Sequence, residues 1–143
     1  MAPTFTCSIV TPTETVFDED VVYVSFPAWD GQQGVMVGQS PLLSRLGTGA
    51  LRVELPGGET RWYLLETGFA QVQDGALTLL TDRVTPAADL SVEDAEAALA
   101  EAAARIPTGG KDLAAIEQDQ RRALASKALA QSHGQVGGQG HGS

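Results

Sequence analysis

The chain has 143 residues with 18 acidic and 9 basic side chains, which gives a net charge of −9 at pH 7 and a pI near 4.5. This length fits one ordinary domain or a small domain with an appendage, and the acidic balance repels phosphate backbones, so nucleic acid is not an expected partner. No apolar stretch approaches the roughly 20 residues that span a bilayer, so direct membrane insertion is not expected either.

Residues 1–87 are predicted to form an all-β domain, because short apolar runs alternate with polar residues and are cut by glycine, proline or aspartate. Two alternating sets are expected to line strand faces: Phe5, Cys7 and Ile9, and then Val22, Val24 and Phe26. Two hairpins are expected, with residues 51–55 and 60–66 around Pro56-Gly57-Gly58 and residues 69–73 and 76–81 around Asp74-Gly75. This density of strands and turns indicates an antiparallel sandwich or flattened barrel.

Residues 88–131 are predicted to form an antiparallel α-helical hairpin, because the composition changes after Pro86 to alanine, glutamate and leucine. Ser91 with Asp94 resembles a capping box at the start of the first helix, and Pro107 to Gly110 separates it from the second. The apolar stripes are expected at Val92, Ala95, Leu99, Ala102 and Ile106, and at Leu113, Ile116, Ala123, Leu124 and Ala128. Residues 132–143 are too glycine-rich to stay ordered and are expected to form a disordered tail.

Side chains for catalysis are scarce in the part predicted to fold. Both histidines, His133 and His141, lie in the glycine-rich tail, so no preorganised histidine base or metal cage is expected. The segment Gly31-Gln32-Gln33-Gly34 lacks the lysine and hydroxyl of a phosphate-binding loop. The acids Asp18 to Asp20 fit a solvated turn. The sequence therefore predicts a protein that is not an enzyme by itself and has no catalytic residue, cofactor or metal site.

Two segments, Asp30 to Leu43 and Gly68 to Val72, resemble the signature of one family, the epsilon subunit of F-type ATP synthases. The family patterns run roughly G-x-x-G-I-x-P-G-H-x-P-L-L and G-G-F-x-E-V. The residues that keep them are Gly31, Gly34, Val35, Gly38, Pro41, Leu42, Leu43, Gly68, Phe69 and Val72. The departures are Val37 and Gln39 for proline and histidine, and Thr67 and Gln71 for glycine and glutamate.

This resemblance implies a non-catalytic rotor part that couples ion translocation to ATP synthesis, held peripherally at the cytoplasmic face of the inner (plasma) membrane. In the family the sandwich packs on the gamma subunit and touches the polar loops of the ring of c subunits. The residues that would serve this interface are Gly31, Gln32, Gly34, Gly38, Gln39, Leu42 and Leu43. The amides of Gln32 and Gln39 suit polar contacts. Leu42 and Leu43 fit either apolar contact with a partner or the core of the sandwich.

The helical hairpin corresponds to the family's mobile arm, which can extend along gamma, contact the catalytic beta subunits transiently and inhibit ATP hydrolysis. The basic side chains that could serve this inhibition are Arg121, Arg122 and Lys127, although they fit a solvated helix face equally well. ATP-binding relatives carry I/L-D-x-x-R-A near the start of the first helix. Here Ser91 and Asp94 replace the aspartate and the arginine, so ATP binding is not expected.

Two other interpretations fit parts of the sequence. One is a stand-alone β-sandwich interaction module whose helical hairpin dimerises. The other is a small hydrolase that would use Asp18 to Asp20 or Glu66. A concave site around those carboxylates would favour the hydrolase.

Overall fold

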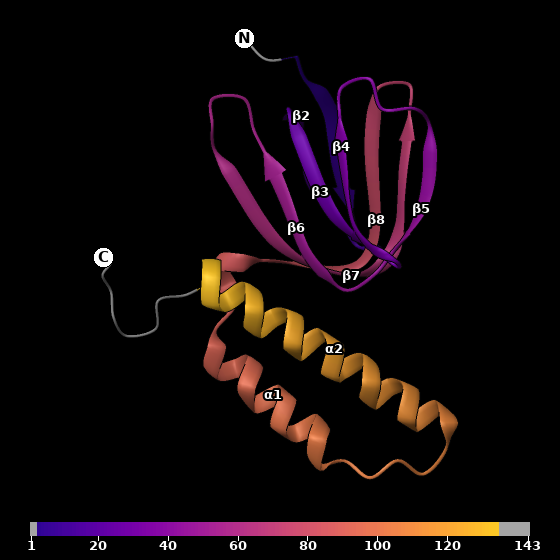
Figure 1. The fold of residues 1–143 in the computed structure, drawn as a ribbon, viewed down its shortest axis with the longest axis vertical. Coiled ribbons are helices and arrows are strands. Elements are labelled where there is room, and N and C mark those ends of the chain that lie inside the picture. The colour runs from indigo at the N-terminus through magenta and orange to yellow at the C-terminus, as the bar shows by residue number, and fades with distance from the viewer. Residues whose placement is uncertain (1–2, 135–143) are drawn as a thin grey trace, which may run out of the picture. The chain divides into compact units, whose positions relative to one another are not determined.

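The computed structural model describes residues 3–134, and it confirms the predicted fold class of a β-sandwich followed by two helices (Figure 1). The chain divides into two compact units, Met1–Pro86 and Ala87–Ser143. The strands are β1 (Phe5–Val10), β2 (Thr15–Val21), β3 (Tyr23–Ala28), β4 (Gly31–Met36), β5 (Leu42–Leu46), β6 (Gly49–Glu54), β7 (Thr60–Gln73) and β8 (Ala76–Pro86). The helices are the 3₁₀ turn η1 (Ala87–Asp89), α1 (Val92–Ala104) and α2 (Gly110–His133). Within residues 3–134, no helix is long and apolar enough to cross a membrane.

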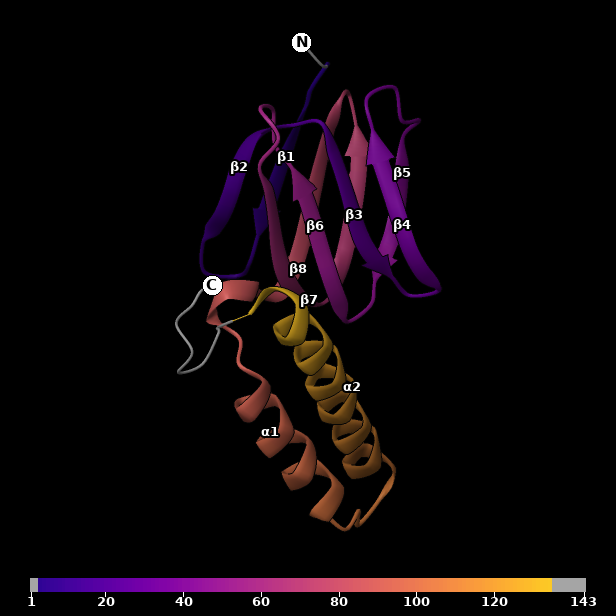
Figure 2. The same cartoon turned by 60° about the vertical axis from the view of Figure 1, so that its left-hand side comes forward.

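The β unit has two layers that share the long strand β7. Its first part, Thr60 to Leu65, pairs with β6, and its second part, Gly68 to Val72, pairs with β5, while β8 runs along the other edge of both parts. One layer continues from β8 to β1 and β2, and the other from β6 to β3 and β4. Strand β1 pairs with β8 in parallel, whereas the sequence predicted antiparallel pairing throughout. The long β7–β8 hairpin is the feature that joins the two layers (Figure 2).

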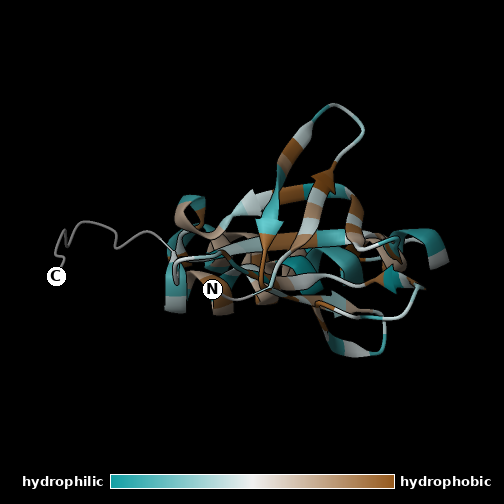
Figure 3. Cartoon of the chain, turned by 90° about the horizontal axis from the view of Figure 1, so that it is seen from above, coloured by the Kyte–Doolittle hydropathy of each residue, from teal (hydrophilic) through white to brown (hydrophobic). Residues whose placement is uncertain are grey.

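The core fills the space between the layers with the inward residues of each strand. In β1 the alternation is as predicted, because Phe5, Cys7 and Ile9 are buried while Thr6 and Ser8 face outward and donate hydrogen bonds to Asp20 and Asp18. Figure 3 shows the same banding of apolar and polar residues along the strands. Burial raises the pKa of the Cys7 thiol to about 12, with a smaller contribution from the charge of Asp18, so this cysteine stays protonated in the core.

The predicted alternation from Val22 to Phe26 is wrong at its first residue. Val22 lies at the bend between β2 and β3, where its N–H donates to the carbonyl oxygen of Glu54 at 2.8 Å, and its side chain is only half-buried. Val21 takes the buried position instead, while Val24 and Phe26 are buried as expected. A bend changes which side of the chain faces the core, and simple alternation cannot anticipate it.

Both predicted hairpins are present. Glu54 pairs with Thr60 around the first turn, and Gln73 pairs with Ala76 around the second. Asp74 and Gly75 have φ values of 54° and 77°, the pair of left-handed conformations that a two-residue hairpin turn of the favoured twist requires. The second hairpin is longer than expected, because residues 60–66 and 69–73 belong to one continuous strand.

The helical unit is an antiparallel pair in which α1 and α2 lie side by side (Figures 1 and 2). Ser91 caps α1 as predicted, because its hydroxyl accepts a hydrogen bond from the Asp94 N–H at 3.0 Å. The residues buried in this pair are Ala95, Ala102, Ile116, Ala123, Ser126, Leu129 and Ala130. Most of them are small, so the two helices bury little apolar surface between them.

The predicted stripes are partly wrong in the helical unit. Ile106 is 83% exposed because α1 ends at Ala104, two residues before it. Leu113, Leu124 and Ala128 are also exposed, and Ser126, Leu129 and Ala130 take the buried positions on α2. Ser132 and His133, assigned to the glycine-rich tail, lie in the last turn of α2, whereas His141 lies outside the described residues.

Candidate subunit-docking surface

The predicted interface residues do not form one patch. Gly31 and Gln32 begin strand β4, whereas Gly38 and Gln39 follow its other end, so the two pairs are separated by about 20 Å of extended chain. The Gln32 amide donates to the Ser25 hydroxyl at 3.0 Å and to the Ala50 carbonyl at 2.9 Å. It is therefore engaged within its own layer rather than held out for a partner.

The three glycines of this segment have different physical roles. Gly31 and Gly38 have φ values of 134° and 88°, conformations that side chains disfavour, and a Cβ on either would meet nothing within 4 Å. Gly34 has no such backbone requirement. The side chain of Tyr23 lies across it, and a Cβ there would overlap the Tyr23 hydroxyl. Gly34 thus makes room for an aromatic ring on the outer face of the sheet.

Replacing Gly34 with alanine should cost about 1 to 2 kcal/mol of the free energy of unfolding, because Tyr23 must leave its position. Tyr23 also lies against the guanidinium of Arg52, 5.6 Å from the ring centroid, and this contact would be lost with it. Urea denaturation measures the effect. A variant as stable as the original chain would mean that the ring moves aside without loss.

The two predicted leucines differ in exposure. Leu42 is half-buried and packs against the core, whereas Leu43 is 72% exposed. Strand β5 therefore uses Leu42 for the sandwich and leaves Leu43 on its outer face. Of the two alternatives open for these residues, the structure places Leu42 in the core and leaves Leu43 free for contact.

Next to Leu43, the same outer face carries a groove that the predicted set of residues does not include. Its volume is about 560 Å³, and it is lined by Val10, Thr11, Pro12, Arg45, Leu46, Thr67, Gly68, Phe69, Leu80, Thr81 and Asp82. The pairings Arg45 with Phe69, Phe69 with Leu80 and Leu80 with Val10 place these residues in one row across four strands. Phe69 and Leu80 are 50% and 46% exposed, so large apolar side chains meet solvent here.

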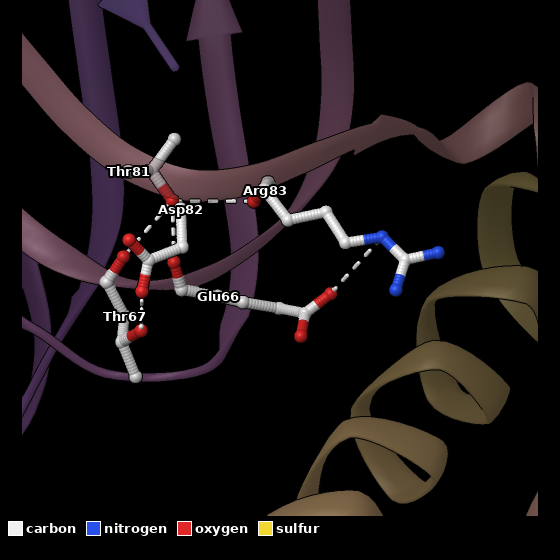
Figure 4. A network of polar contacts seen from close by, with 5 residues as sticks. All are labelled: Glu66, Thr67, Thr81, Asp82 and Arg83. Carbon is white, nitrogen blue, oxygen red and sulfur yellow. Dashed lines mark hydrogen bonds and ion pairs between the residues drawn. The ribbon is translucent and has the colours of Figure 1, made fainter. Parts of the chain in front are cut away.

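Gly68 shapes this groove at the point where β7 passes from one layer to the other. Its φ is 144°, and a Cβ would overlap the carbonyl oxygen of Leu80 and lie 2.8 Å from the Thr81 Cα. The neighbouring Thr81 hydroxyl is buried and contacts three main-chain carbonyl oxygens, those of Glu66, Thr67 at 3.0 Å and Arg83 at 3.2 Å (Figure 4). Strands β7 and β8 are therefore held at close range beneath the groove.

The charged side chains at the groove differ in their hydrogen-bond and ion-pair partners. Asp82 accepts a hydrogen bond from the Thr67 hydroxyl at 2.9 Å, and just outside the groove Arg83 lies 3.7 Å from Glu66 (Figure 4). Arg45, on the opposite edge, is exposed, and its main-chain carbonyl oxygen accepts a hydrogen bond from the Trp29 N–H at 2.9 Å. The groove thus combines an apolar floor with a cation at its β5 edge, an arrangement suited to a protein partner.

Sequence reasoning had a signal for this groove. In Phe69-Ala70-Gln71-Val72 the alternation puts Phe69 on the same face as the polar Gln71, and in Leu79-Leu80 one leucine must point outward. A large apolar residue at an outward position indicates a contact surface.

The carboxylates that a hydrolase would use lie away from this groove. Asp18 and Asp20 are exposed on edge strand β2, and neither they nor Glu66 line the groove.

The basic residues assigned to the arm are on α2, where each has a partner. Lys127 lies 3.2 Å from Glu96 of α1, Arg121 donates to Gln118 at 3.1 Å, and Arg122 is also engaged. Among residues 3–134, no cluster of three or more histidine, cysteine, aspartate or glutamate side chains could hold a metal ion.

Residues 4–87 match the family model of the ATP synthase delta/epsilon chain, beta-sandwich domain. The class of protein is therefore the delta/epsilon chains of ATP synthases. The ATP synthase epsilon chain of Rhodopirellula baltica is 41% identical over 96 residues, covering 67% of this chain and 74% of that one. That of Desulforamulus reducens is 34% identical over 113 residues, covering 79% and 85%. The chain belongs to the epsilon-subunit family of F-type ATP synthases.

Solved structures share the fold. A chain of the Euglena gracilis mitochondrial ATP synthase (OSCP/F1/c-ring) has a TM-score of 0.80 at 24% identity, covering 90% of this chain and 82% of that one. A chain of the Tetrahymena thermophila mitochondrial ATP synthase central stalk and c-ring has a TM-score of 0.67 at 10% identity, covering 90% and 98%. At these identities the likeness concerns the fold.

Proposed function

We propose that this chain is a non-catalytic part of the ATP synthase central stalk, which couples ion translocation through the membrane ring to ATP synthesis in the catalytic head. The β-sandwich would join the gamma subunit and the ring of c subunits at the cytoplasmic face of the inner membrane. The helical hairpin would contact the catalytic beta subunits transiently through Arg121, Arg122 or Lys127 and slow ATP hydrolysis. Family membership and the fold support this assignment.

The observation that carries the proposal is the apolar groove around Gly68. A face with Leu43, Phe69 and Leu80 exposed suits burial against another protein, and Arg45 can pair with an acidic group at its edge. We assign this face to the gamma subunit. The end of β4 near Gln39 is left for the polar loops of the ring, since the Gln32 amide is engaged within its own layer.

Replacing Phe69 with aspartate should weaken binding to gamma at least about tenfold, because it puts a charge into the centre of the buried contact. The stability of the isolated chain should change by about 1 kcal/mol or less, since Phe69 is half-exposed. Titration of the purified chain against the gamma subunit measures the affinity, and urea denaturation checks the fold.

The matched control is Met36→Asp, which changes another exposed apolar residue that lies outside the groove. It should leave the affinity for gamma within about threefold. Equal affinity of the folded Phe69 variant and the original chain would remove the groove from the interface. If neither form binds gamma, a stand-alone interaction module becomes the better interpretation.

A further inference from the structure

The two helices of the C-terminal unit share an interface that is poor in large apolar side chains. Apart from Ile116 and Leu129, the buried residues are alanines and one serine. Leu113 and Leu124 face solvent instead of the partner helix. Apolar burial alone therefore gives this pair little preference for the closed arrangement.

In the described part of the chain, ion pairs connect the α1 segment with α2 at two places. Arg105, the residue that directly follows α1, lies 2.6 Å from Asp119 of α2, and Glu101 also contacts its guanidinium at 3.2 Å. About 13 Å further along α1, Glu96 lies 3.2 Å from Lys127 of α2. The two pairs have opposite polarity, because α1 supplies the cation in one and the anion in the other.

The ion pair at Arg105 is partly shielded from solvent. The Arg105 side chain is 33% exposed, and its Nε is buried with no hydrogen-bond partner among residues 3–134. A donor buried without a partner carries a desolvation cost, so it offsets part of what the contact of the guanidinium with Asp119 contributes. Opening the hairpin would return both groups to water.

We propose that the pairs Arg105–Asp119 and Glu96–Lys127 form an electrostatic latch, which holds the helical hairpin closed and makes its opening depend on ionic strength. The Glu96–Lys127 ion pair has a second consequence, which rests on the proposed function. Because Lys127 is already paired with Glu96, an acidic surface of another subunit must displace Glu96 before it can bind this lysine.

The latch can be tested on the full chain with spin labels at Ala98→Cys and Ala128→Cys, two exposed helix positions. The native Cys7 is fully buried and stays unlabelled. Raising the salt from 50 mM to 1 M should increase the open population several-fold, because the screening length falls to about 3 Å. The double variant Glu96→Gln with Asp119→Asn should open about tenfold more at low salt and lose most of the salt response.

The matched control is Glu117→Gln, which removes one negative charge from an exposed position of α2. It should change neither the open population nor its salt response. The exchanged pair Glu96→Lys with Lys127→Glu keeps opposite charges at these two positions, so it should leave the hairpin as closed as in the original chain. This variant tests the latch even if the neutral double variant loses helical content. Failure of the exchanged pair to close, or a distance distribution independent of salt in the original chain, would overturn the latch.

The same variants separate the latch from the proposed brake. Assembled ATP synthase carrying Glu96→Gln should show stronger inhibition of ATP hydrolysis if Lys127 contacts the catalytic subunits. Opening of the isolated chain without any change in hydrolysis would leave the latch standing and contradict only the inhibitory role of Lys127.

Discussion

Replacing Gly68 with alanine should destabilise the β-sandwich by more than about 4 kcal/mol, a large fraction of the stability of a domain of this size. The added Cβ would overlap the Leu80 carbonyl oxygen and crowd the Thr81 Cα, which are both backbone groups and cannot swing away. The φ of 144° adds strain for any side chain. Strands β7 and β8 would have to separate where they are closest.

The matched control is Gly58→Ala, which has a φ of 99° but open space around its Cβ. It isolates the backbone strain and should cost about 1 kcal/mol. Urea denaturation of the two variants, followed by tryptophan fluorescence, gives the comparison. Similar costs for the two substitutions would mean that β7 and β8 can move apart at Gly68 without losing the fold.

Ending the chain after Pro86 should leave the β-sandwich folded, within about 1 kcal/mol of its original stability, whereas the fragment 87–143 should lose nearly all of its helix. The residues of the main core cluster all lie between Phe5 and Leu79. The helical unit buries mostly alanine and serine, and isolated helices of this length are marginal in water. Circular dichroism of the two fragments measures both outcomes.

A chain that ends at Gln73 serves as the comparison for this truncation. It lacks β8, which pairs with both β1 and β7, so it should not fold. An unfolded or aggregated fragment 1–86 would contradict the separation into two units. The fragment should also keep its affinity for gamma, because the groove around Phe69 lies entirely within it.

The sequence predicted elements well where one rule governs them. Alternation in Phe5, Cys7 and Ile9 identified a strand face, and Ser91 with Asp94 identified the start of a helix. It failed where tertiary structure intervenes. Val22 lies at a bend, and Ile106 lies beyond the end of α1. The exposure of both side chains therefore depends on where the strand or helix ends, which the periodicity of apolar residues does not show.

The groove lies outside the predicted set of interface residues, for a similar reason. The family motifs contain Phe69 and Gly68, but motif matching does not say which side chains face outward. The groove depends on pairings between residues far apart in sequence, such as Val10 with Leu80 and Arg45 with Phe69. The first pairing comes from the parallel contact of β1 with β8 and the second from the antiparallel contact of β5 with β7, and local patterns specify neither contact.

The sharing of β7 between the two layers has a mechanical consequence. A load applied at the groove acts on the segment after Gly68, and it passes along an unbroken main chain to residues 60–65 in the opposite layer. Sliding one layer over the other would require peptide geometry to distort as well as side-chain contacts to break. The sandwich should therefore resist twisting as a single stiff block, with little energy lost to internal shear.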